Sequence, residues 1–143
     1  GFDAIWISPV ITNTPGGYHG YWAQNLLTIN SNFGTEKDLF QLVSECHSRG
    51  IWVMVDVVAN HVGPVGYSYS TIVPFNDASH YHNCNSCPSG CQIQDFNNQP
   101  QVEDCRLAGL PDLNQTNSFV SNALLSWITN LTSFYGFDGV RID

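Results

Sequence analysis

Residues 51–58 constrain the fold more than any other stretch of this sequence. Seven of these eight residues are apolar and five are β-branched, with a single acid, Asp56, among them. A strand that is apolar on both faces is typical of a parallel sheet whose two sides are covered. The stretch therefore predicts a buried strand of an α/β protein.

The preceding segments complete a β-α-β unit. Residues 2–9 form a short apolar run that ends near a proline, which predicts another buried strand. Residues 10–32 have no helical period and are rich in glycine and aromatic residues, so they predict a loop. A helix is predicted from Thr35, which can form a capping box with Asp38, to Gly50. Its apolar face comprises Leu39, Leu42, Val43 and Cys46.

The second half of the chain adds an irregular insert, a helix and a strand. Residues 62–113 lose all periodicity, which predicts an inserted subdomain stabilised by disulfides. A helix then runs from about Asn117 to Gly136, and residues 136–143 predict a last strand. The apolar stripe of this helix comprises Val120, Leu124, Trp127, Ile128, Leu131 and Phe134 or Tyr135.

The order β-α-β-insert-α-β predicts part of a (β/α)8 barrel, because three parallel strands with right-handed crossovers cannot close one. The expected division is a barrel part at 1–61, the insert at 62–113 and a second barrel part at 114–143. The chain begins without Met, opens directly into a strand and ends on one. Both ends are therefore expected to be cut from a longer protein.

Composition narrows the class of ligand. The formal net charge is −8, which argues against a nucleic acid or an anionic membrane surface as partner. No apolar run is long enough to span a membrane. Aromatic residues make up 13% and charged residues only 11%, a balance that fits a secreted protein binding neutral polar ligands such as sugars.

Polar residues gather where the predicted strands end. Asp56, Asn60 and His61 run off the end of the strand at 51–58. Arg141 and Asp143 end the last strand on one face, with Val140 and Ile142 pointing to the other. β/α barrels keep their active sites at the carboxyl ends of the strands, so an oriented, ionised Asp there is a candidate nucleophile. The alternatives are a structural Arg–Asp pair and a strand-end turn with backbone hydrogen bonds.

A second group of residues offers oxygen ligands. Asn60, Glu103 and Asp112 would supply hard oxygen atoms, which suit calcium and not a transition metal. A calcium ion there would fix the insert against the barrel. The alternative is that the two acids are simply solvated.

Five segments follow the order and spacing of one protein family. They are Tyr18-His-Gly-Tyr-Trp22, Asp56-Val-Val-Ala-Asn-His61, Gln101-Val-Glu-Asp-Cys105, Leu110-Pro-Asp-Leu113 and Gly139-Val-Arg-Ile-Asp143. With them the sequence resembles the α-amylase family of retaining glycoside hydrolases, and within it the secreted fungal members. The resemblance covers essentially the whole chain. It implies a partial TIM barrel with about strands 2 to 4 of the family barrel, and makes the insert the family's domain B.

The resemblance implies a catalytic role for the last strand. Asp143 matches the nucleophile that forms the covalent glycosyl-enzyme, and Arg141 matches the partner that orients it. Asp56 is expected to be structural, holding the strand ends near the site. The general acid, a Glu on the next strand, and a second essential Asp are expected beyond residue 143. The segment 1–143 alone is therefore predicted to be inactive.

The resemblance also assigns substrate-binding residues. His19, Tyr21 and His61 match residues around the sugar at the cleavage point, and Tyr21 is placed to stack on it. Trp22 belongs to the same aromatic loop and either binds substrate or supports the loop. The loop before Tyr18 is short and Gly-rich beside the fungal pattern, which leaves the outer sugar subsites undefined.

The implied calcium site uses the oxygen-bearing residues named above. Asn60 and Asp112 match calcium ligands through their side chains, and Glu103 matches one through its backbone carbonyl. Ca2+ is accordingly the expected cofactor.

The five cysteines divide into a cluster and a single thiol. Cys84, Cys87, Cys91 and Cys105 lie in the insert, where two disulfides are favoured over a metal site because no second close pair follows the Cys-x-x-Cys. Cys46 lies on an apolar helix face and is expected to be a buried free thiol. The resemblance pairs Cys91 with Cys105. Cys84 and Cys87 are additional, and pair with each other or with a group absent here.

The expected activity is endo-hydrolysis of α-1,4-glucosidic bonds in starch and malto-oligosaccharides by a secreted, extracellular, calcium-dependent enzyme. The full-length protein is expected to be a monomer. Alternatives are another enzyme of the family, an α-glucosidase or a glucan transferase, and a non-catalytic glucan-binding relative. Two glycosylation sequons, Asn114-Gln-Thr and Asn130-Leu-Thr, fit a secreted protein.

Overall fold

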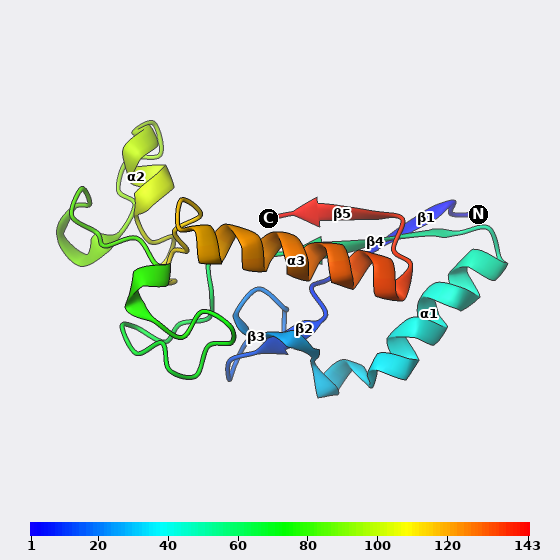
Figure 1. The fold of residues 1–143 in the computed structure, drawn as a ribbon. Helices are drawn as coiled ribbons and strands as arrows, with labels where there is room; N and C mark the ends of the chain where they lie inside the picture. Colours follow the sequence, from blue (N-terminus) through cyan, green and yellow to red (C-terminus); the bar gives the residue numbers. More distant parts are fainter.

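A computed structural model describes residues 1–143 and contains a three-stranded parallel sheet with two long helices (Figure 1). The strands are β1 (Ala4–Ile7), β4 (Trp52–Val57) and β5 (Gly139–Ile142), in the order β1-β4-β5. Both pairings are parallel, so the predicted strands and their direction are confirmed. None of the helices combines the length and the apolar character needed to cross a membrane.

Helix α1 (Glu36–Ser48) begins and ends as its sequence predicts. Thr35 and Asp38 form the capping box, which satisfies free N–H groups at the first turn. Leu39 and Val43 are buried, whereas Leu42 is 42% exposed and lies at the edge of the apolar face. Cys46 is a free thiol, but it is only partly buried.

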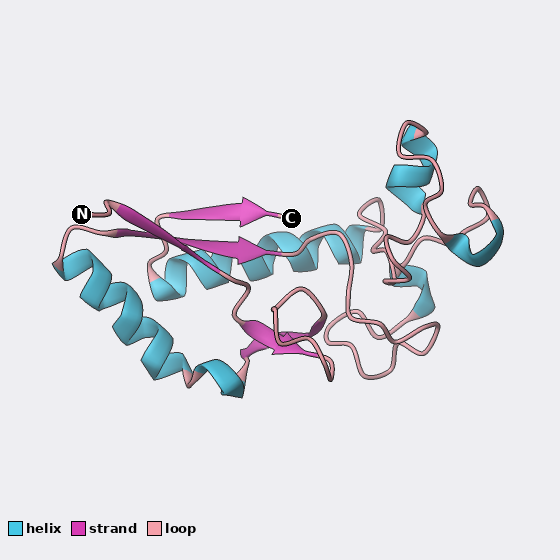
Figure 2. Ribbon diagram, turned by 180° about the vertical axis from the view of Figure 1, so that it is seen from behind, coloured by secondary structure: helices cyan, strands magenta, loops and turns pink.

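Helix α3 (Ser118–Tyr135) packs against the same side of the sheet as α1 (Figures 1 and 2). Asn117 caps its first turn, and Gly136 ends it in the left-handed conformation with φ 74°. Tyr135 is buried and Phe134 is 64% exposed, so Tyr135 completes the apolar stripe. The other buried members of the stripe are Val120, Leu124, Trp127 and Leu131.

Within residues 1–143 the two long helices cover one face of the sheet, whereas the sequence predicted a strand covered on both faces. The opposite face is covered only at its carboxyl end, where Asp56 is buried against Tyr21 and Arg141. Val53, Val55 and Val57 of β4 are fully buried in the core with the helices. The opposite face carries Trp6 and Trp52, which are 56% and 68% exposed. The helices α1 and α3 pack on the face of the valines, since Val43 of α1 and Trp127 of α3 belong to the same hydrophobic core as the three valines.

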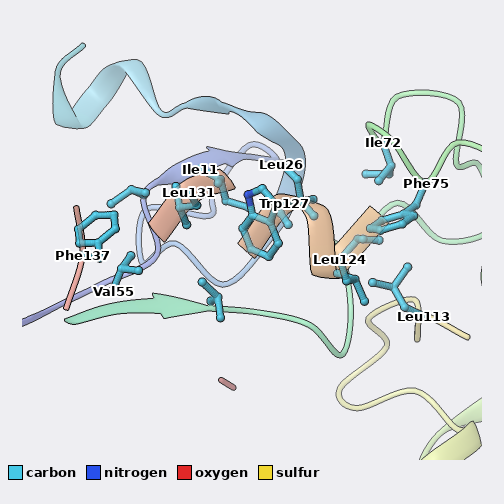
Figure 3. Packing of buried hydrophobic residues seen from close by; sticks show 14 of the residues in the cluster. Ile11, Leu26, Val55, Ile72, Phe75, Leu113, Leu124, Trp127, Leu131 and Phe137 are labelled. Atoms are coloured by element: carbon cyan, nitrogen blue, oxygen red, sulfur yellow. The ribbon is translucent and has the colours of Figure 1, made fainter. Parts of the chain in front are cut away.

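Residues 10–32 are not a plain loop, and this expectation was wrong. They contain an antiparallel pair, β2 (Ile11–Asn13) and β3 (Ala23–Ile29), followed by a 3-10 turn, η1 (Ser31–Phe33). β2 has three residues and its register against β3 shifts twice, so no period of two is visible in the sequence. Ile11 and Leu26 of this hairpin are buried beside α3 (Figure 3).

The insert at 62–113 is mostly irregular, as predicted. Its regular elements are η2 (Ala78–His80), η3 (Ser89–Cys91) and the short helix α2 (Gln99–Asp104). Ile72, Phe75 and Leu113 are fully buried and belong to the same hydrophobic core as the sheet and α3 (Figure 3). The insert therefore packs on the barrel part and does not form a core of its own.

The expected pairing of Cys91 with Cys105 is replaced by two other disulfides. Cys84 pairs with Cys91 at a Cα–Cα distance of 5.3 Å, and Cys87 pairs with Cys105 at 5.7 Å. Both distances suit a disulfide. The cause is the additional Cys-x-x-Cys, because the chain turns at residues 84–87 and brings one of its two cysteines to each of the expected partners.

Candidate active site

Charged residues converge at the carboxyl ends of β4 and β5. In the ladder between these strands Asp56 lies directly opposite Arg141, and the backbone N–H of Asp143 donates to the carbonyl of Val57 at 2.9 Å. Arg141 and Asp143 leave the sheet on the same face as Asp56. The structure thus brings together three of the predicted residues from segments far apart in the sequence.

Arg141 lies between two carboxylates. Its Nη1 is 2.8 Å from Oδ2 of Asp56 and 2.5 Å from Oδ1 of Asp143. The hydrogen bond to Asp56, together with the charge of Asp143, raises the pKa of the Arg141 guanidinium above its ordinary value. The ring of Trp6 lies 5.3 Å from the guanidinium carbon and supports it as a cation–π partner. Arg141 therefore holds Asp143 in a fixed orientation.

The two carboxylates differ in their access to solvent. The side chain of Asp56 is 0% exposed and that of Asp143 is 29% exposed. Oδ2 of Asp56 also accepts the hydroxyl of Tyr21 at 2.9 Å, while its Oδ1 is buried without a hydrogen-bond partner. Burial and this hydrogen bond raise the pKa of Tyr21. Asp143 is thus the carboxylate that can meet a ligand, and Asp56 is the one that supports it.

The aromatic loop is closed by one backbone hydrogen bond and one hydrogen bond to a side chain at its base. The N–H of Thr14 donates to the carbonyl of Trp22 at 2.9 Å, and the N–H of Trp22 donates to Oδ1 of Asn13 at 2.7 Å. Gly20 has φ 94°, and a Cβ there would lie 2.7 Å from the carbonyl oxygen of Pro9. No other residue fits this position without a backbone shift.

The His19 ring contacts two other predicted substrate-binding rings, those of Tyr21 and Trp22. His19 stacks on Tyr21 with centroids 5.9 Å apart and meets the edge of Trp22 at 5.0 Å. The N–H of Tyr21 donates to Nδ1 of His19 at 3.0 Å, which makes Nε2 the N–H donor of a neutral His19 ring. The Trp22 ring is half-buried, and a Cβ added to Gly16 would lie 3.3 Å from it, so it packs against residues of its own loop.

His61 lies beneath this loop in a buried position. It is 5% exposed, and burial lowers its pKa, so the imidazole is neutral near pH 7. Asn60 Nδ2 lies 3.3 Å from His61 Nδ1, and Tyr21 O lies 3.2 Å from His61 Nε2. If the Asn60 amide donates, the His61 proton is on Nε2 and points to Tyr21. His61 thus ties the end of β4 to the aromatic loop.

The predicted calcium ligands lie on the other side of Asn60. Asp112 is 4% exposed, accepts from Asn60 Nδ2 at 3.1 Å, and lies 2.6 Å from His82 Nδ1. Burial raises its pKa to about 6. Glu103 on α2 lines, with Asn60 and His82, a cavity of about 550 Å³ that also reaches Asp143.

These residues fit a hard cation in their chemistry. The carboxylate of Asp112 is buried with no Lys or Arg partner, next to the amide of Asn60. No three His, Cys, Asp or Glu side chains converge there, so a cation would depend on amide and backbone oxygens such as the Glu103 carbonyl. His82, which also lies 3.7 Å from Asp104, was missed by sequence reasoning because only the folded insert brings it to Asp112.

The fold and site together define a class of protein. A parallel β/α sheet carries an arginine-paired aspartate at its strand ends, beneath an aromatic loop and beside an inserted subdomain. The family model described as "Alpha amylase, catalytic domain" matches residues 1–143. The chain belongs to the alpha-amylase family.

Individual relatives agree with this assignment. An alpha-amylase of Saccharomycopsis fibuligera is 41% identical over 157 residues, covering 100% of this chain and 31% of the relative. The structure of an alpha-amylase from Malbranchea cinnamomea matches with a TM-score of 0.89 and 42% identity, over 100% of this chain and 32% of that one. An alpha-amylase from Geobacillus thermoleovorans, solved with acarbose, matches with a TM-score of 0.87 and 38% identity, over 100% and 30%. The chain thus spans about a third of the length of these relatives.

Proposed function

We propose that this chain is the nucleophile-bearing part of an enzyme that hydrolyses internal α-1,4-glucosidic bonds in starch and malto-oligosaccharides with retention of configuration. The observation that carries the proposal is the Asp56–Arg141–Asp143 arrangement, in which Arg141 is fixed by a buried acid and orients a solvent-accessible one. The acarbose complex of the Geobacillus relative supports an oligosaccharide-like ligand.

The two carboxylates have different roles in the reaction, because Asp143 is accessible to substrate and Asp56 is not. In the first step the Asp143 carboxylate attacks the anomeric carbon, the glycosidic C–O bond breaks, and a general acid protonates the leaving oxygen. In the second step water attacks the glycosyl ester, gives its proton to the same group and releases Asp143. Asp56 cannot be the acid, because it is buried and bound to Arg141 and Tyr21. The acid must therefore come from another strand end, roughly 5 Å from Asp143.

The aromatic loop would orient the sugar for this attack. His19 and Tyr21 form a stacked pair whose positions are fixed by the closed loop. Tyr21 is also tied to Asp56 by its hydroxyl, so the ring that faces the sugar and the arginine that orients the nucleophile share one support. Fixing both on one buried acid favours a constant distance between substrate and nucleophile.

The experiment uses the full-length enzyme that contains these residues, with soluble starch. Loss of iodine colour is followed against release of reducing ends, with Asp143→Asn as the inactive comparison. We expect early loss of colour at few reducing ends, and no hydrolysis by the variant. Colour that persists while glucose accumulates would indicate an exo-acting enzyme, and full activity in Asp143→Asn would remove Asp143 from the mechanism.

Calcium binding belongs to the same proposal. Asn60, Asp112 and the carbonyl of Glu103 would hold the ion, which would neutralise the buried charge and fix α2 and the insert against the end of β4. The support is the burial of Asp112, whose carboxylate contacts the Asn60 amide and the His82 ring and has no Lys or Arg partner. A chelator should lower the Tm of the full-length enzyme, and added Ca2+ should restore it. An Asp112→Asn variant should start from the lower Tm and respond to neither treatment; a chelator without effect on the wild-type Tm would refute the site.

Secretion and glycosylation complete the proposal. The support is the two sequons, of which Asn130 lies on the exposed side of α3. Asn114 is partly buried, and its Oδ1 accepts from the backbone N–H of Thr116 at 3.0 Å and the Thr116 hydroxyl at 2.6 Å. The full-length protein from a yeast secretory host should lose mass on treatment with an N-glycosidase, and Asn130→Gln should remove that shift. Light scattering of the same protein should give a monomer.

A further inference from the structure

A second, fully neutral cavity lies beside the aromatic loop. It has a volume of about 360 Å³ and is formed between residues 12–18, Gln24 of β3 and the turn at 30–32. No charged residue lines it, and most of its lining residues carry an amide, a hydroxyl or no side chain at all. This volume lies within the range of about 300 to 1,000 Å³ that is common for small-molecule sites.

The cavity presents hydrogen-bonding groups that the protein does not use. Asn30 is only 7% exposed, and its Oδ1 accepts the N–H of Asn32 at 3.1 Å. Its Nδ2 makes no hydrogen bond within the protein, and neither does the side-chain amide of Gln24. The Nδ2 of Asn30 is accessible from the cavity, so this group and the half-buried Gln24 amide are free to donate to a bound ligand. The free groups therefore favour a ligand with several neutral hydroxyl oxygens.

An aromatic side chain lies at the rim of the cavity. Tyr18 is 86% exposed, and its hydroxyl makes no hydrogen bond within the protein. Its ring meets the edge of His19 with centroids 5.2 Å apart, which orients it without covering its outer face. An exposed ring above neutral amides has the mixed apolar and polar character that a sugar ring also has.

The cavity is separated from the cleavage point by the loop itself. It shares no lining residue with the cluster of Tyr21, Asp56 and Asp143. A Cβ on Gly16 would lie 3.3 Å from the Trp22 ring, so the Trp22 indole packs directly against this side of the loop. His19 and Tyr21 form the other side. One loop thus presents a catalytic face and a second, neutral face.

We propose that this cavity binds a glucosyl unit of the α-glucan, as a second sugar site apart from the bond that is cleaved. This inference rests on the proposed function, which identifies the sugar as glucosyl. The uncharged amide and hydroxyl lining of the cavity indicates only that its ligand is neutral and rich in hydroxyl groups. A second contact of this kind holds long or granular glucans on the enzyme and is not needed by short substrates.

The test compares adsorption with catalysis in the full-length enzyme. Tyr18→Ala/Gln24→Ala is compared with wild type and with Gln41→Ala, a matched change at an exposed position of α1 that makes no hydrogen bond. Binding to granular starch is measured by depletion in an Asp143→Asn background, where no starch is consumed. Turnover of a short chromogenic maltotrioside is measured with Asp143 in place.

We expect the double variant to bind granular starch about tenfold more weakly, since it loses two or three polar contacts and the ring. Its turnover of the maltotrioside should stay within about twofold of wild type, and Gln41→Ala should match wild type in both assays. Unchanged adsorption would overturn the second site and leave the proposed function intact. A parallel fall in adsorption and maltotrioside turnover would also overturn it, because the residues would then serve the cleavage point.

Two further measurements distinguish a failure of the second sugar site from a loss of stability and from a failure of the proposed function. If the double variant has a lower Tm, Gln24→Ala alone gives the same comparison at a position where no intramolecular hydrogen bond is lost. If the wild-type enzyme cleaves neither starch nor the maltotrioside, the proposed function fails. The cavity is then tested by adsorption alone: in the Asp143→Asn background, the Tyr18→Ala/Gln24→Ala change should still weaken binding to granular starch.

Discussion

Asp56 is the residue on which the site depends most, although it does not meet the substrate. One buried oxygen accepts both the Tyr21 hydroxyl and the Arg141 guanidinium. The sequence predicts that Asp56 and Arg141 lie at strand ends. It cannot show that they pair, because they are 85 positions apart and meet only through the register of β4 and β5.

The Asp56→Asn substitution should therefore impair catalysis from a distance. A neutral amide cannot balance the charge of Arg141, so the guanidinium is held less firmly and Asp143 loses its fixed orientation. We expect kcat on starch to fall about 100-fold in the full-length enzyme with a small change in KM. The free energy of unfolding, measured by urea titration, should fall by about 2 kcal/mol, because the buried Asp56 side chain loses its charge-assisted hydrogen bond from Arg141.

Tyr21→Phe is the matched control for that experiment. It removes only the hydroxyl and keeps the Asp56–Arg141 pair, so unfolding should lose about 1 kcal/mol. A kcat in Asp56→Asn equal to that of wild type would show that Asp143 does not depend on this support.

At the scale of elements, the helices were predictable and the hairpin was not. Caps and an apolar period of 3.6 are local signals, and both α1 and α3 carry them. The strands β2 and β3 are stabilised instead by contacts with α3, which is distant in sequence, and their pairing has an irregular register. Neither feature produces a pattern in the local sequence. The two faces of the aromatic loop follow from this hairpin, so the neutral cavity could not be predicted either.

The end of α3 allows a test of its cap. Gly136 has φ 74°, and a Cβ there would have only one neighbour, His47 Cε1 at 4.0 Å. Gly136→Ala should therefore cost only the backbone strain, about 1 kcal/mol of unfolding free energy. Thermal unfolding of the full-length enzyme measures the loss, and Gly1→Ala, with nothing within 4 Å of its added Cβ, is the control. An unchanged Tm would mean that the helix does not end on this residue.

Asp138 links β5 to its neighbours and should make stability depend on pH. Its Oδ2 accepts the N–H of Val53 at 2.7 Å and contacts Nε2 of His47 at 2.8 Å. The hydrogen bond from Val53, and next that from His47, lowers the pKa of Asp138 below 3.8. A lowered folded-state pKa stabilises the protein above the unfolded-state pKa, and this contribution disappears as pH falls through the folded-state value.

The Asp138→Asn variant should remove that contribution. Its Tm should be lower than that of wild type at pH 7, and the two Tm values should converge below about pH 4. A scan of Tm from pH 7 to pH 3 measures this. A constant difference across the range would assign the loss to packing and not to charge.

At the scale of the whole molecule, the insert and the barrel part form one structure. Phe75 and Leu113 of the insert belong to the same hydrophobic core as Val55 of the sheet (Figure 3). Backbone bonds from Val62 to Pro111 and from Leu113 to Asn60 join the base of the insert to the end of β4. The residues proposed for calcium lie at this junction, so their geometry depends on how the insert is held.

The two disulfides hold the outer end of the insert, and their pairing is open to direct test. Cys87–Cys105 spans 18 residues and ties α2 back to the loop at 84–87, whereas Cys84–Cys91 spans 7. On the chain-entropy model, replacing the first pair by serine should cost about 3 kcal/mol of unfolding free energy, and replacing the second about 2 kcal/mol. Mass mapping of a non-reduced digest should find both pairs. Peptides joined through Cys91 and Cys105 would instead show that the additional cysteines pair with each other, and the two serine double variants would then leave unpaired thiols and a larger loss than these values.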